Sequence, residues 1–248
     1  MEKLFYIFVL TLFLCACADE NNYAPVTDVS TIEHVPKHGT YRVLPGETLY
    51  SIAWRYGLDY RYLASINHIA PPFHVVAGQR IYLKRQSSSV SRIQTPGKTI
   101  PASPIHSMVV RQPVYQPIYA VDRDASKPVA LWNWPAHGPI VGLYSTFNKG
   151  INIGGQMGNP VFATAAGQVV YNGSGLRGYG HLVIIKHNNT YLSAYAHNSL
   201  VLVREGQRVH AGQEIAEMGH TASGQAMLHF EIRRNGQPVN PLSYLQHR

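Results

Sequence analysis

Short runs of alternating apolar and polar residues recur through the C-terminal half of the chain, each bounded by glycine or asparagine. A period of two places alternate side chains on one face of a strand, and glycine and asparagine mark turns. The pattern therefore predicts a mainly antiparallel β domain over residues 131–248, with no helix of comparable length. The runs are GQVVYNG, HLVIIKH, TYLSAYAH, SLVLVREG, QEIAEMG and LHFEIRRNG.

A shorter segment, residues 38–84, has a mixed pattern. YRVLPGETL predicts a strand, a turn at Pro45-Gly46 and a helix start capped at Glu47 and Thr48. LYSIAWRYG has apolar residues at helical spacing and ends at a glycine, YLASIN predicts a second short helix, and VVAGQRIYL predicts a closing strand. We therefore expect a small βααβ module here, separate from the β domain.

The first residues indicate export. An apolar run from Leu4 to Leu14 is too short to span a bilayer and fits a signal sequence over residues 1–16. It ends in Leu-Cys-Ala-Cys, which resembles a bacterial lipobox with Cys17 as the lipidated residue. An ordinary cleaved signal with incidental cysteines is the alternative. Since Cys15 is the only other cysteine, the mature chain is expected to form no internal disulfide.

Polar segments flank the module. Residues 17–37 are expected to form a tether. Residues 85–130, rich in serine, proline and glutamine, are expected to form an extended linker. The formal net charge of +8 favours an anionic partner surface, but the charge is spread along the chain without a block of like charges. Nucleic acid is therefore not an expected partner.

The pattern V-x-x-G-[ED]-T-L-x-x-I-A with a closing G-Q-x-[IL] makes the βααβ module closely resemble a LysM domain. The resemblance implies binding of N-acetylglucosamine-containing glycans, and so of peptidoglycan, in a shallow groove. The alternative role of the turn before the first helix is helix capping alone. By position the groove would be lined by Pro45, Gly46, Glu47, Thr48, Ile69, Pro71 and Phe73.

The β domain resembles the LytM/lysostaphin-type zinc peptidases, whose motifs are H-x-G-[IL]-D, G-[YF]-G, Y-x-H and H-x-H-F-E. The first His, the Asp and the last His bind zinc in that family, and the two other histidines assist catalysis. At the five functional positions this chain has Asn148, Asn152, His197, Met227 and His229. Only His229 is still a metal ligand, while His197 keeps a catalytic position.

Neutral amide oxygens are poor substitutes for the imidazole and carboxylate ligands that zinc prefers, and a thioether transfers no proton. We therefore expect no metal, no cofactor and no catalytic residue in this degenerate domain. The other histidines, His181, His187, His210 and His220, lack a ligand spacing with His229 and are expected at the surface or in turns.

A peptide-shaped cleft without a metal is a candidate binding groove. Period-two alternation predicts that Tyr179, Leu182 and Tyr195 border it, with Lys149 and Arg233 at its rim. Tyrosine and arginine are frequent anchors of protein interfaces. Sheet packing is the alternative for each tyrosine.

Lipobox, LysM module, Pro/Ser-rich linker and degenerate LytM domain together resemble the NlpD-type murein hydrolase activators. The resemblance implies a non-enzymatic lipoprotein of the outer membrane, facing the periplasm. It implies that the protein activates a zinc-dependent N-acetylmuramoyl-L-alanine amidase and promotes septal wall splitting and daughter-cell separation. Two alternatives are a zinc endopeptidase acting on peptidoglycan and a passive wall-binding lipoprotein.

Overall fold

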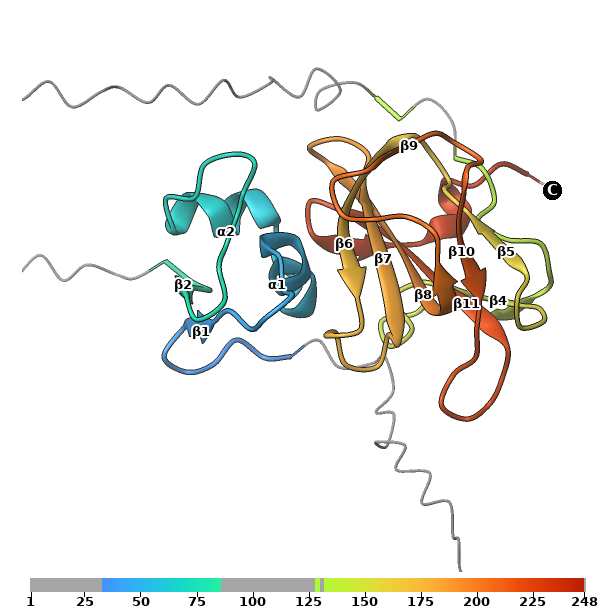
Figure 1. Ribbon diagram of the computed structural model, residues 1–248, viewed down its shortest axis with the longest axis horizontal. Helices are drawn as coiled ribbons and strands as arrows, with labels where there is room; N and C mark the ends of the chain where they lie inside the picture. The colour runs from blue at the N-terminus through green and yellow to red at the C-terminus, as the bar shows by residue number, and fades with distance from the viewer. Residues whose placement is uncertain (1–32, 86–127, 130–131, 248) are drawn as a thin grey trace, which may run out of the picture.

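The computed structural model describes residues 33–85, 128–129 and 132–247 (Figure 1). The signal sequence with Cys17 and most of the tether and the linker lie outside these residues, so those expectations stand as predictions. Among the residues described, no helix is long and apolar enough to cross a membrane. We call residues 38–84 the N-terminal module and residues 132–247 the C-terminal domain.

The N-terminal module has the expected order of strand, helix, helix and strand. Its elements are β1 (Thr40–Arg42), α1 (Leu49–Arg55), α2 (Tyr60–Ile66) and β2 (Arg80–Tyr82), with the two strands antiparallel. Thr48 begins α1 with a capping box, in which its hydroxyl accepts from the amide of Ser51 and the Ser51 hydroxyl accepts from the amide of Thr48. Two amides that the helix leaves unpaired are thereby satisfied, which fixes where α1 begins.

The C-terminal domain is built on an antiparallel sheet of order β3-β4-β11-β8-β7-β6-β9, with β12 paired to β11 and with β10 joining β8 to β5. The fold class predicted from the alternating runs is confirmed. The strands are β3 (Ile140–Gly142), β4 (Ile151–Gly154), β5 (Pro160–Phe162), β6 (Gly167–Gly173), β7 (His181–Lys186), β8 (Tyr191–Val201), β9 (Arg208–Val209), β10 (Glu214–Met218), β11 (Met227–Arg234) and β12 (Gln237–Val239).

One predicted strand differs from the observed one. The run SLVLVREG does not form a strand of its own, because its first three residues extend β8 and the rest form the loop and turn before β9. β8 is thereby long enough to pair with β7, β11 and β10. It is the strand around which the sheet is organised.

The two faces of the sheet bury different side chains. On one face, alternate residues of β11 and β8 such as Phe230, Ile232 and Tyr195 enter a core completed by Trp132 and by residues of β5 and β10. A 3₁₀ turn, η1 (Pro241–Ser243), closes the chain near this core. The opposite face carries Leu182, Ile184 and alanines of β8, which belong to a second apolar cluster.

That second cluster joins the two modules. It contains Leu182, Ile184 and Ala194 of the sheet together with Leu49, Ile52 and Trp54 of α1. Figure 1 shows α1 beside β6, and α1 and β6 are in contact. The N-terminal module therefore packs against the face of the sheet opposite the core that contains Phe230 and Tyr195.

Candidate functional site

Strand β11 supplies the row of side chains at the centre of the site. Leu228, Phe230 and Ile232 enter the core on one face of the sheet. Because side chains alternate along a strand, the residues between them project to the face covered by the N-terminal module. Those residues are Met227, His229, Glu231 and Arg233.

Asn152 of β4 lies directly opposite His229 in the register of the sheet. Its Oδ1 is 2.7 Å from Nδ1 of His229, so the two side chains form a direct hydrogen bond. Two ligands of one tetrahedral zinc, each about 2.0–2.2 Å from the metal, would lie roughly 3.4 Å apart. The two side chains are therefore closer together than two ligands of one zinc ion would be.

The other asparagine of the motif has a different role. The Asn148 amide nitrogen donates to the carbonyls of Leu143 and Gly150, both at 3.0 Å, and so stabilises the loop before β4. A Cβ at position 150 would lie 2.2 Å from the carbonyl oxygen of Phe230, so only glycine allows β4 to approach β11 this closely. The backbone of the motif is retained while its side chains bind one another and the main chain.

Glu231 is the hub of the buried polar network. Its carboxylate accepts from the hydroxyl of Tyr179 at 2.6 Å, from Nε of Arg233 at 3.0 Å and from Nε2 of His229 at 3.2 Å. Burial alone would raise the pKa of this carboxyl, but the guanidinium of Arg233 and the hydrogen bond from His229 outweigh it and lower the pKa to about 2. Glu231 is thus ionised and fully partnered, which leaves it no role as a proton acceptor for water.

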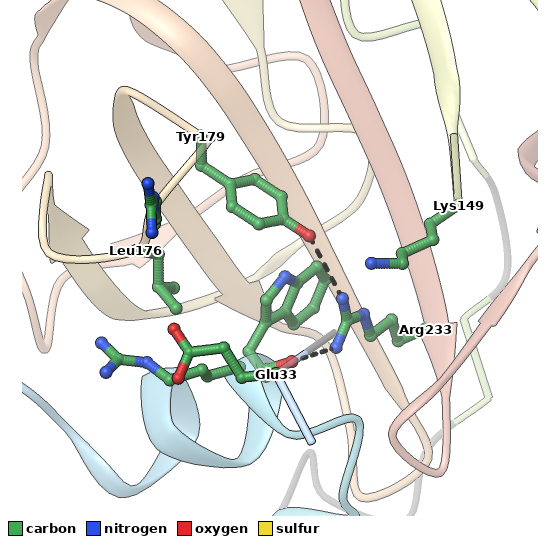
Figure 2. Close-up of a pocket in the computed structure, with 8 residues that line it drawn as sticks. Glu33, Lys149, Leu176, Tyr179 and Arg233 are labelled. Atoms are coloured by element: carbon green, nitrogen blue, oxygen red, sulfur yellow. Dashed lines mark hydrogen bonds between the residues drawn. The ribbon is translucent and has the colours of Figure 1, made fainter. Parts of the chain in front are cut away.

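Lys149 and Arg233, expected at the rim of the groove, are both buried. Figure 2 shows their side chains and that of Tyr179 pointing toward one another. Burial lowers the pKa of Lys149; nearby Arg233 acts in the same direction and Glu231 opposes it. Burial also raises the pKa of Tyr179, reinforced by the charge of Glu231.

These side chains border a cavity of about 140 Å³ between the two modules (Figure 2). The lining residues are Glu33, Trp54, Arg55, Lys149, Leu176, Arg177, Tyr179 and Arg233. Four of them are cationic side chains and one is acidic, so the cavity favours carbonyl or carboxylate oxygens.

His197 and Met227 are the two residues at the predicted catalytic positions of the LytM-like motif. The rings of His197 and His229 are 6.3 Å apart, and burial followed by the charge of His229 lowers the pKa of His197 to about 4. Met227 begins β11 opposite Gly154 and is partly exposed. The structure therefore brings Asn152, His197, Met227 and His229 to one face of the sheet.

Tyr195 does not join them, contrary to the expectation from period-two alternation. Its side chain is fully buried in the opposite core, where its hydroxyl bonds to Thr164 and Ser193. A register shift between β7 and β8 gives β8 one extra residue, and His197 has a φ of +65°. This bulge turns His197 to the other face. Leu182 is on the predicted face, but it is fully buried in the apolar cluster between the modules.

The prediction that the other histidines lie at the surface or in turns is corrected for His187. His187 follows β7 in a hairpin loop, but it is buried, with Nδ1 2.9 Å from the Ala166 carbonyl and Nε2 2.7 Å from the Ser193 hydroxyl. Burial lowers its pKa to about 4. Spacing alone did not reveal this role, because both contacts are made by the tertiary fold.

The predicted glycan-binding residues of the N-terminal module divide into two groups. Pro45, Gly46 and Pro71 are exposed, and Ile69 and Phe73 are partly buried, with Phe73 packed on Tyr50 and Tyr60. Glu47 is buried, and its carboxylate accepts from the Tyr41 hydroxyl, the Leu44 amide and Arg55. Thr48 caps α1 and also donates to the Val170 carbonyl of β6 at 3.1 Å. Glu47 and Thr48 thus have structural partners.

Three residues that the sequence did not single out are central to the site. Glu231 organises the polar network, and Trp54 and Arg55 enter from the other module. Arg233 donates to the Trp54 carbonyl at 2.7 Å, and its guanidinium carbon lies 3.5 Å from the centre of the Trp54 ring. Only the LHFE motif gave a signal for Glu231, and nothing local in the sequence marks Trp54.

The residues present do not fit a zinc ion. Among the described residues, no group of three His, Cys, Asp or Glu side chains is placed to hold a metal. Of the three ligand positions in the LytM motif, two hold neutral amides and the third, His229, is hydrogen-bonded on both ring nitrogens. The three positions offer a single imidazole and no anionic ligand, which is fewer strong donors than a catalytic zinc requires.

Comparison with known proteins agrees with this two-module organisation. Residues 41–84 match the LysM domain family, and residues 146–241 match peptidase family M23. A Pseudomonas aeruginosa protein named "Lipoprotein NlpD/LppB homolog" is 47% identical over 234 residues, covering 85% of this chain and 78% of the relative. The chain belongs to the NlpD/LppB lipoprotein family.

Other members of the NlpD/LppB family have more informative names. The "Murein hydrolase activator NlpD" of Escherichia coli is 38% identical over 258 residues, covering 84% of this chain and 68% of the relative. The "Outer membrane antigenic lipoprotein B" of Haemophilus influenzae is 34% identical and covers 84% of this chain and 64% of the relative. The solved catalytic domain of lysostaphin from Staphylococcus simulans is 27% identical, covering 44% of this chain and 87% of that one with a TM-score of 0.38.

Proposed function

We propose that this protein is a non-enzymatic activator of a periplasmic N-acetylmuramoyl-L-alanine amidase. The observation that carries the proposal is the 2.7 Å hydrogen bond between Asn152 and His229 at the former zinc position. With the metal ligands replaced, the fold of a peptidoglycan peptidase keeps its cleft without the means to hydrolyse. A cleft of this kind is suited to binding a partner.

Membership of the NlpD/LppB family supports the proposal, since relatives from Escherichia coli and Salmonella typhimurium are named murein hydrolase activators. The N-terminal module matches the LysM family, so we assign it to peptidoglycan. Relatives named outer membrane lipoproteins, together with the lipobox, support a lipid anchor at Cys17 and a position on the outer membrane facing the periplasm. Activation there would promote septal wall splitting and daughter-cell separation.

Activation is a shift of populations in the partner. An activator that binds the open, active form of the amidase more tightly than the autoinhibited form raises the population of the open form. In this domain the groove candidates are Lys149, Tyr179 and Arg233, which line the cavity. Their guanidinium, ammonium and hydroxyl groups favour backbone carbonyls and carboxylates of a bound segment.

A dye-release assay on labelled peptidoglycan tests the proposal. The purified mature chain, with Cys17 replaced by serine, is assayed alone and with candidate periplasmic amidases. We expect no release by the chain alone and strong stimulation of one amidase. Release by the chain alone that a chelator abolishes would favour the zinc endopeptidase. Binding to peptidoglycan without stimulation of any amidase would favour a passive wall-binding lipoprotein.

A further inference from the structure

We propose that the last turn of α1 occupies the partner-binding face of the C-terminal domain, so that the N-terminal module acts as a displaceable lid. This inference rests on the proposed function and adds a regulatory step to it. It also defines the chemistry of the partner segment, a short helix end that presents an aromatic ring and main-chain carbonyls. α1 would hold the place of that segment in the closed chain.

The contact between Arg233 and Trp54 is at the centre of the interface between the lid and the C-terminal domain. The guanidinium stacks on the indole ring at 3.5 Å and donates to the main-chain oxygen of the same residue at 2.7 Å. Trp54 is 2% exposed and Arg233 is 1% exposed, so water does not compete for either contact. Desolvation strengthens a cation–π pair of this kind, so the contact contributes to closing the lid.

Helix chemistry explains why a helix end fits this face. The carbonyls of the last turn of an α-helix carry a partial negative charge. In α1 the Trp54 carbonyl accepts from the Gly57 amide at 3.2 Å and, having two lone pairs, accepts a second donor as well. The C-terminal domain supplies donors to that end of α1, from Arg233 to the Trp54 carbonyl and from Nε2 of Gln237 to the Gly57 carbonyl at 2.8 Å. A partner helix with an aromatic residue in its last turn could use the same donors.

Further contacts hold the lid closed along its length. Arg55 donates to the Gly175 carbonyl at 3.0 Å, and Arg61 donates to Oδ1 of Asn235 at 2.9 Å. Gly236, in the turn between β11 and β12, lies so close to the N-terminal module that a Cβ there would be 2.5 Å from the Leu58 carbonyl oxygen. The interface is thus complementary from β6 to the β11–β12 turn.

The two modules are joined by enough residues for the N-terminal module to move away from the C-terminal domain while still attached to it. Residues 86–127 lie between the described parts of the two modules. A segment of that length can span up to roughly 140 Å when extended. While attached, the lid competes with a partner at an effective concentration on the order of millimolar. The apparent affinity for the amidase therefore equals the affinity of the open form multiplied by the fraction of molecules that are open.

Gly236→Asn is a variant that opens the interface, and Gly206→Asn is its matched control. Both glycines are turn residues with similar φ values of +80° and +81°, which asparagine tolerates better than most residues. A Cβ at position 236 collides with the N-terminal module, whereas one at position 206 meets nothing within 4 Å. Gln237→Ala, a second opening variant, removes only the hydrogen bond to Gly57.

The experiment titrates the full mature chain, with Cys17 replaced by serine, into an amidase dye-release assay and measures the radius of gyration by X-ray scattering. We expect Gly236→Asn to increase the radius and to lower the half-maximal activating concentration by about three-fold, which corresponds to roughly one third of the unmodified chain being open. Gln237→Ala should act in the same direction to a smaller extent, and Gly206→Asn should match the unmodified chain.

An increased radius for Gly236→Asn with an unchanged half-maximal concentration would overturn the lid. So would equal radii and equal activating concentrations for the two opening variants and the unmodified chain. An absence of dye release with every chain, with the radius increased for Gly236→Asn, would instead contradict the proposed function. The two failures are therefore distinguishable.

Discussion

The guanidinium of Arg233 stacks on the indole of Trp54 while its Nε donates to Glu231, so one side chain joins the N-terminal module to the polar network of the C-terminal domain. Glu231 and Arg233 are both essentially inaccessible to solvent. A buried ion pair adds little relative to well-packed apolar residues, but removal of one partner strands the other charge. The pair therefore makes the interface sensitive to substitution.

Arg233→Ala should destabilise the protein by about 3–5 kcal/mol, because it leaves the Glu231 carboxylate without its cation. It should also separate the modules, because the stacking on Trp54 is lost. Urea denaturation gives the free energy of unfolding, and X-ray scattering gives the separation. The neighbouring Arg234 is exposed, so Arg234→Ala should change the free energy of unfolding by no more than about 0.5 kcal/mol. Equal stability of the two variants would contradict the role assigned to Arg233.

Zinc should not stabilise the unmodified protein. It should stabilise a variant in which the missing metal ligands are restored. The double variant Asn148→His and Asn152→Asp adds an imidazole and a carboxylate to His229, which is the ligand number of a catalytic zinc site. At a zinc concentration of 100 times the Kd, binding should stabilise that variant by about 2.7 kcal/mol. The measurement is the thermal midpoint with zinc and with chelator, with Asn148→His alone as control. Stoichiometric zinc in the unmodified purified protein would contradict the expectation.

Much of the fold could be predicted from the sequence, because alternation and helix capping depend on residues close together in the chain. Alternation bounded by glycines predicted β6, β7, β10 and β11 nearly residue by residue, and capping at Thr48 placed the start of α1. The assignment of Asn148 and Asn152 to metal-ligand positions rests on residue type at the motif positions of the LytM resemblance, and it stays a prediction. The structure added that Asn152 bonds to His229 while Asn148 supports a loop.

The parts that the sequence did not predict depend on contacts between distant segments. A single extra residue in β8 turned His197 and Tyr195 to opposite faces, and no local pattern marks such a bulge. Arg233 is covered by Trp54 of α1, a helix whose apolar residues were assigned only to the core of the N-terminal module. Residues such as Trp54 serve the module's own core and the interface together, so helical periodicity cannot separate the two roles.

Acid should weaken the fold through His187 well before the carboxylates titrate. Burial lowers the pKa of this histidine from 6.5 to about 4, so the folded state holds it neutral. The unfolded chain takes up the proton below about pH 6.5, so stability is lost as the pH falls from 6.5 toward 4. Between pH 7 and pH 5 the loss from this group is about 2 kcal/mol. Urea denaturation at the two pH values measures it.

The matching variants isolate that contribution. His187→Gln keeps a side chain able to bond to the Ala166 carbonyl but cannot take up a proton, so its free energy of unfolding should depend less on pH. His210 is exposed, and His210→Gln should keep the pH dependence of the unmodified chain. A pH dependence that is the same for all three proteins would show that His187 is not the titrating group.

Glu47 is predicted to stabilise the N-terminal module without contacting the glycan. Its carboxylate accepts from the Tyr41 hydroxyl and the Leu44 amide, both at 2.8 Å, and pairs with Arg55, which also donates to the Gly175 carbonyl of the C-terminal domain. Glu47→Gln should therefore cost about 1–3 kcal/mol of stability, because these buried donors lose a charged acceptor. Binding of N-acetylglucosamine oligomers by the folded variant, measured calorimetrically, should be unchanged.

Pro45 is exposed at the predicted groove, so Pro45→Ala should give the reverse result, weaker oligomer binding at unchanged stability. Loss of oligomer binding in Glu47→Gln at full stability would instead place this carboxylate in the glycan site.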